Sequence, residues 1–169
     1  MPADKRTLVL AIQTRLEDRQ WGGTGSVVFG NGAVRVVQAI DAESALRTMR
    51  VPLALIIPGA FRSDPDHAGQ QPDYLVGTVT VRIATAHRGD EIGELAVVGG
   101  HRPSSTASEG AGLLQIEQEV QAAIGTLDAD ESVEIQFRDT GDQGTLIHPQ
   151  HKFVAWIDMV FEAVCTRTA

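Results

Sequence analysis

The chain has 169 residues, of which 43% are hydrophobic and 21% are charged, and its formal net charge is −8. This composition is typical of a globular protein, and the length suits one domain, residues 1–169. No apolar run reaches the ~20 residues of a membrane-spanning helix, and the first residues lack the apolar core of a signal peptide, so we expect no membrane association. The acidic balance, with no basic cluster longer than Lys5-Arg6, excludes proteins that grip nucleic acid electrostatically.

The chain begins with a predicted helix over residues 5–17. Asp4 has the residue type of a helix N-cap, and an apolar stripe with helical spacing follows it. Leu10 falls nearly opposite that stripe, so we expect it to point outward. We therefore take Leu10 as a first candidate for a contact between subunits.

A hairpin, a short helix and a strand are predicted next. Asn31-Gly32 lies between two short apolar runs, and this pair favours a type I′ turn, so residues 26–39 predict a β-hairpin. A short helix capped by Asp41 ends before Pro52, because proline disfavours helix in the residue that precedes it. The continuous apolar run 53–57 then predicts a buried strand that ends at Pro58.

The second half alternates strands with long connections. Two strands are predicted, over residues 73–85 and 133–138, because apolar and polar residues alternate there. A helix is predicted from about 111 to 124, since its apolar residues recur with helical spacing. Long loops are expected at about residues 62–72, 87–111 and 139–152.

Residues 153–165 predict a last strand, with one wholly apolar face that should lie on the core. Strand side chains alternate faces, and every odd position from Phe153 to Cys165 is apolar. Cys165, the only cysteine, is therefore expected to be a packing residue. The even positions mix apolar and charged residues, so we expect another element or another subunit to cover them. Four of them are candidate interface residues: Trp156, Asp158, Val160 and Glu162. We expect Trp156 to be covered within the subunit and the other three to lie nearer to an interface.

These elements predict an α+β domain with a mainly antiparallel, twisted β-sheet flanked by two or three α-helices. No catalytic, cofactor-binding or metal-binding site is evident. The glycines of residues 22–25 lack the preceding strand and following lysine of a phosphate-binding loop. His148 and His151, and the group at residues 64–67, lack the converging ligands of a metal site.

The order of elements resembles that of the tail terminator proteins of long-tailed bacteriophages, also called tail completion or minor tail proteins of the tail–head joint. The likeness lies in the N-terminal amphipathic helix, the short helix leading into residues 52–58, the long strand 74–85, the helix 113–124 and the closing strand pair. The phrase Phe-Val-Ala-Trp-Ile-Asp-Met-Val-Phe-Glu, residues 153–162, is similar to the terminal strand of that family.

The resemblance implies a structural virion protein without catalysis and without cofactors. It would form a homohexameric ring on the end of the tail tube, stop tube polymerisation, and offer a docking face to the head-completion or stopper connector. Its partners would then be copies of itself, the major tail tube protein and that connector. It would reside in the neck of the virion, and in the host cytoplasm during assembly. The acidic charge suits a lumen through which genome DNA slides without sequence-specific binding.

Two alternatives remain open. One is another neck or connector component, such as a stopper or a tube-like protein. The other is a small α+β enzyme or ligand-binding domain that uses the loops around His101 and His148.

Overall fold

The computed structural model of the chain describes residues 3–63, 74–86, 111–127, 133–149 and 153–167. Within these residues the protein has an α+β fold, as predicted, with three α-helices and a five-stranded, mostly antiparallel sheet. The helices are α1 (Lys5–Glu17), α2 (Ala42–Thr48) and α4 (Leu113–Gly125), with short 3-10 turns η1 (Trp21–Gly23) and η2 (Ala39–Asp41). The strands are β1 (Val34–Val36), β2 (Leu53–Ser63), β3 (Tyr74–Thr85), β4 (Glu134–Leu146) and β5 (Val154–Thr166).

The strands lie in the order β1-β2-β3-β5-β4, which places the last strand of the chain inside the sheet. β1 is parallel to β2, and the other three pairings are antiparallel. β5 pairs with β3 from Ala155 to Thr166, so these two strands form the long spine of the sheet. The N-terminus is tied to the same strand, because the Thr166 N–H donates to the Ala3 carbonyl at 3.0 Å.

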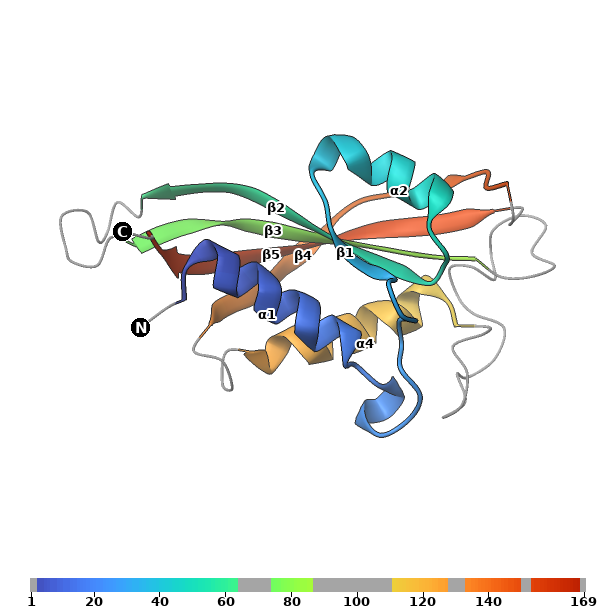
Figure 1. Cartoon of the computed structure of the whole chain (residues 1–169), viewed down its shortest axis with the longest axis horizontal. Coiled ribbons are helices and arrows are strands. Elements are labelled where there is room, and N and C mark those ends of the chain that lie inside the picture. The colour runs from blue at the N-terminus through green and yellow to red at the C-terminus, as the bar shows by residue number, and fades with distance from the viewer. Residues whose placement is uncertain (1–2, 64–73, 87–110, 128–132, 150–152, 168–169) are drawn as a thin grey trace.

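The sheet has two unequal faces (Figure 1). Helices α1 and α4 cover the first face, which we call the core face, whereas α2 lies over one end of the second face. The odd positions of β5 are buried in the core, as the alternation predicted: Ala155, Ile157, Met159, Phe161, Ala163 and Cys165. Burial raises the pKa of the Cys165 thiol, which favours its neutral, packing role.

Local capping explains where the two long helices begin. The Asp4 carboxylate accepts a hydrogen bond from the Thr7 N–H at 2.7 Å, and α1 spans the predicted residues. Hydrogen bonds from the backbone and the side chain of Thr7 lower the pKa of Asp4. In α4 the Gln115 side chain accepts from the Gly112 N–H at 2.9 Å, which satisfies a donor that the helix itself leaves unpaired.

The predicted hairpin at Asn31-Gly32 is wrong. The turn exists, with Gly32 at φ 76° and the Ala33 N–H donating to the Gly30 carbonyl at 3.0 Å. However, β1 after the turn pairs in parallel with β2, and the run before the turn joins no strand of the sheet. Val28 and Phe29 are instead buried in the core, so their packing outweighs the local preference of the turn for a hairpin.

β2 also differs from its prediction, because it continues past Pro58 to Ser63. A register shift between Pro58 and Phe61 accommodates the proline within the pairing to β3. Proline has no N–H to donate, and it is tolerated at bulges and on the unpaired side of a strand. Arg62 and Ser63 of the first predicted loop are therefore strand, and residues 64–72 lie outside the described residues.

The predicted loop at residues 139–152 is wrong over its first part, because β4 extends to Leu146. This segment is polar and exposed, so it carries no pattern of a buried strand. It forms a strand because β5 is long and offers unpaired backbone groups along its free side, which β4 follows with two register shifts. The loop predicted at 87–111 lies outside the described residues except for Ala111.

Candidate interaction surface

The second face of the sheet carries the predicted interface residues of β5. Paired residues of antiparallel strands share a face, so the register places Trp156, Asp158, Val160 and Glu162 opposite Ala84, Arg82, Thr80 and Thr78 of β3. Helix α2 lies over the end of this face that contains Trp156, and Ala42 and Leu46 of the helix are buried. The four residues therefore divide between a covered end and an uncovered end.

A buried ion pair occupies the covered end. Arg82 donates two hydrogen bonds to Asp158, at 2.7 and 2.8 Å, and the two side chains are 17% and 11% exposed. The Arg82 guanidinium also lies over the Trp156 ring, 4.0 Å from its centre. The hydrogen bonds to Asp158 raise the pKa of Arg82, and Asp142 and Glu43 add a weaker effect of the same sign. Asp158 is thus a structural partner of Arg82, and its place near an interface stays a prediction.

The remaining part of the second face we call the open half. Three residues of β3, Val76, Thr78 and Thr80, face Val164, Glu162 and Val160 of β5, and all six side chains are half-buried. No helix of the described residues lies over them (Figure 1). The open half therefore presents three valines among threonines, in a setting intermediate between core and water.

Glu162 forms the polar border of the open half. Its carboxylate accepts a hydrogen bond from Arg138 of β4 at 3.3 Å, and the Arg138 and Glu162 side chains are 60% and 46% exposed. An exposed pair of this kind contributes little to stability, about 0–1 kcal/mol. Arg138 and Glu162 are consequently available to exchange partners when another molecule approaches.

Leu10 does not join these residues. It projects from α1, which covers the core face of the sheet, and it is 41% exposed. It lies in an open groove on the outer side of α1, with small side chains from Thr7, Ala11 and Thr14. If Leu10 makes a subunit contact, that contact belongs to a surface different from the open half.

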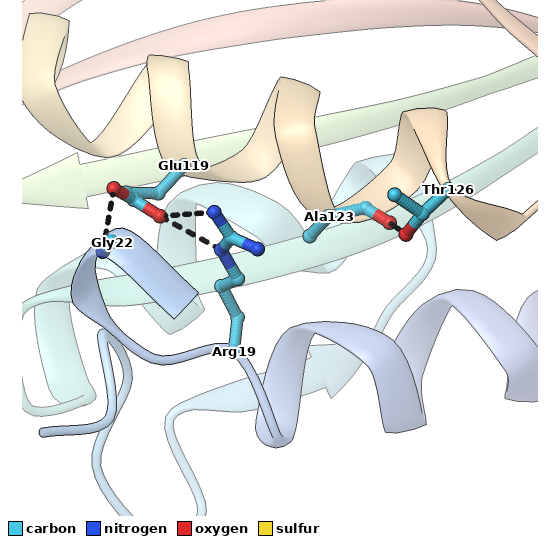
Figure 2. Close-up of polar contacts among 5 residues, drawn as sticks. All are labelled: Arg19, Gly22, Glu119, Ala123 and Thr126. Atoms are coloured by element: carbon cyan, nitrogen blue, oxygen red, sulfur yellow. Dashed lines mark hydrogen bonds and ion pairs between the residues drawn. The ribbon is translucent and has the colours of Figure 1, made fainter. Parts of the chain in front are cut away.

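The glycine-rich turn after α1 is committed to a contact within the chain. Figure 2 shows Glu119 of α4 between Arg19 and this turn. Its carboxylate accepts hydrogen bonds from Arg19 at 2.7 Å and from the Gly22 N–H at 3.2 Å. Farther along α4, the Thr126 hydroxyl accepts from Arg15 at 2.9 Å and donates to the Ala123 carbonyl at 2.8 Å. The bonds to Glu119 hold the turn against α4, and the bond from Arg15 joins α1 to the end of α4, so the turn serves packing.

Of the histidines His101, His148 and His151, the structure describes only His148. It is buried, with 5% of its surface exposed, whereas His101 and His151 lie outside the described residues. Among the residues that the structure describes, no group of three or more His, Cys, Asp or Glu side chains could hold a metal ion. Over the same residues, no helix is both long and apolar enough to cross a membrane.

Sequence reasoning identified one side of the open half and missed the other. The mixed even positions of β5 pointed to this face, but Val76 of β3, the partner of Val164, was not singled out. The strict alternation of β3, with Thr78 and Thr80 opposite its core residues, is the signal that could have found it. No protein-family model matches the sequence, and a search of curated proteins finds no match to it.

Proposed function

We propose that this protein is a structural subunit that assembles with copies of itself into a ring and caps the end of a phage tail tube. The observation that carries the proposal is the open half, a half-buried strip of valines and threonines that no described helix covers. A strip of this kind is stable in water but gains free energy when a partner removes its apolar area, at roughly 25 cal/mol per Å².

The chemistry of the strip suits assembly between folded subunits. Its valines supply apolar area, while the border pair Arg138–Glu162 keeps the isolated subunit hydrated. In the proposed ring, six copies bind the tube end, block further tube subunits and present a docking surface to the head connector. The net charge of −8 discourages binding of the genome as it passes through the lumen.

The proposal is tested by reconstitution with a major tail tube protein, the partner that the proposal names. Tube protein is allowed to polymerise with and without the purified chain, and tube lengths and tube ends are measured by electron microscopy. We expect shorter tubes whose ends carry a ring. Tubes of unchanged length with bare ends at saturating concentration contradict the proposal.

A second candidate, another component of the neck, uses the same open half and differs in the partner. A stopper or connector binds the head-side ring of the neck and leaves tube growth unchanged. The same reconstitution with connector protein in place of tube protein therefore separates the two functions.

A further inference from the structure

The two edges of the sheet carry opposite charges. One edge, which we call the β2 edge, consists of β1 and the part of β2 that extends beyond it, where β1 pairs only with residues 54–56. The other, the β4 edge, is the outer side of β4. Exposed charged side chains of the β2 edge are Arg35 and Arg62. The β4 edge carries Glu134, Asp139 and Asp142 against one cation, Arg138, which pairs with Glu162 of β5.

These charges lie at matching heights along the strands. Arg62 pairs with Val76, Val76 pairs with Val164, and Val164 pairs with Glu134, so one row crosses the sheet from a cation to an anion. All four side chains share the second face, because cross-strand partners point to the same side. The row thus begins and ends with opposite charges at opposite edges.

A second row repeats the pattern. Arg35 is level with Leu55, which pairs with Arg82, and Arg82 pairs with Asp158. The β4 strand reaches the same height at its second register shift, where Asp142 acts electrostatically on Arg82. The second row therefore also has a cation, Arg35, at the β2 edge and an anion, Asp142, at the β4 edge.

An apolar row lies at an intermediate height along the strands, on the core face rather than on the second face. Pro58 pairs with Val79, Val79 with Phe161, and Phe161 with Phe137, whose ring is 39% exposed at the β4 edge. At the other edge, Pro58 lines an open groove with residues 36–39, in which Val36 is 41% exposed. An exposed aromatic ring and an apolar groove thus lie at the same height on opposite edges.

From these three rows we propose that the β4 edge of one copy docks against the β2 edge of the next copy, with β4 and β2 side by side and a constant rotation between neighbours that closes the ring. This approach brings Glu134 to Arg62 and Asp142 to Arg35, with Phe137 at the groove beside Pro58. The contact is heterologous, since each subunit contributes a different patch on each side. A two-fold dimer through the β2 edge brings only arginines together, which is unfavourable.

The contact is made by side chains rather than by one continuous ladder of backbone hydrogen bonds. Pro58 and its register shift interrupt the β2 edge, and two register shifts interrupt the β4 edge. Such interruptions protect edge strands from uncontrolled pairing. The charges and the aromatic ring then determine which edge is bound and how the two edges are aligned along the strands. A closed ring requires both. The inference rests on the proposed ring assembly and names the surfaces that form it.

The test is a charge reversal and its compensation in the full chain, measured by sedimentation over a wide concentration series. Glu134→Arg and Arg62→Glu should each weaken self-association by about tenfold or more, and the double variant should return to within about threefold of wild type. Asp18→Arg, at the end of α1 in the helix layer, makes the same change of charge away from both edges and should leave association unchanged. High salt should weaken association of the wild type, because exposed charge pairs are screened.

A wild type that stays monomeric at every concentration, or a double variant that associates no better than the single variants, overturns the edge contact. The outcome is separable from the capping experiment. If the chain caps tubes but the charge reversals leave self-association unchanged, the proposed function stands and this contact is refuted. If the reversals weaken self-association and the double variant restores it, but the chain has no effect on tubes, the contact stands and the proposed function is refuted.

Discussion

Removing the carboxylate of Asp158 should destabilise the fold strongly, because it leaves the Arg82 charge without its main partner. Breaking a buried ion pair by removing one partner costs about 3–5 kcal/mol. The Arg82 and Asp158 side chains retain 17% and 11% exposure, so water reaches the pair and the lower end of that range applies, about 3 kcal/mol. For a chain of this size the melting temperature should fall by about 6–12 °C.

The assay is chemical denaturation of Asp158→Ala, followed by circular dichroism, with thermal melting as a second measurement. Asp142 and Glu43 already act on the Arg82 charge and could replace part of the lost partner. Asp142→Asn in the Asp158→Ala background should therefore cost more than Asp142→Asn in the wild type.

The matched control replaces both partners by apolar residues of similar size, Arg82→Met with Asp158→Leu. This double variant should lose less stability than Asp158→Ala alone, because no charge is left unpaired, and the methionine can still lie on the Trp156 ring. A loss below about 1 kcal/mol for Asp158→Ala, or a double variant less stable than the single one, refutes the reasoning.

Three further changes test other parts of the structure. Val160→Asp places a carboxylate on the open half, opposite Asp139, so capping of the tail tube should be lost while the free energy of unfolding falls by only about 1 kcal/mol or less, in reconstitution and denaturation experiments. Gly77→Ala should destabilise the fold by about 1–3 kcal/mol, because a Cβ there meets the Phe61 ring at 2.6 Å. Asp4→Ala should lower stability at neutral pH, and its deficit should vanish as pH falls through the lowered pKa of Asp4, below the usual 3.8.

Each of these changes has a control of the same kind. Val160→Thr keeps the shape without a charge, so capping should survive, and unfolding of the Val160→Asp variant would instead make this position part of the core. Gly125→Ala adds a Cβ in open space and should be neutral or stabilising. Asp4→Asn keeps the N-cap without a titrating group, so it should be close to the wild type at neutral pH and should not show the loss of stability that protonation of Asp4 causes in the wild type, whereas a deficit at neutral pH as large as that of Asp4→Ala contradicts the capping explanation.

The sequence by itself determined the elements whose signals are local. Helix α1 has its N-cap and its apolar stripe within 13 residues, so its bounds could be predicted correctly. The core face of β5 was evident from alternation alone, because the side chains of a strand change faces at every residue. The same alternation indicated a second face that needs a cover, and the open half lies within it.

Only the tertiary structure decided the features that depend on distant partners. Residues 139–146 are strand because β5 supplies the backbone partners, although their own composition predicts a loop. β1 joins the sheet beside β2 rather than forming a hairpin, since burial of Val28 and Phe29 outweighs the turn.

Long-range contacts also decided which residues of the candidate surface are covered and which lie in the open half. Asp158 is paired because Arg82, 76 residues away, is brought opposite it by the register of β3 and β5. The matching of Arg62 with Glu134 across the sheet likewise exists only once four strands are aligned. Charge and hydrophobicity can be read along a chain, but the height of one side chain relative to another is set by hydrogen-bond register between segments, and that register forms only in the folded sheet.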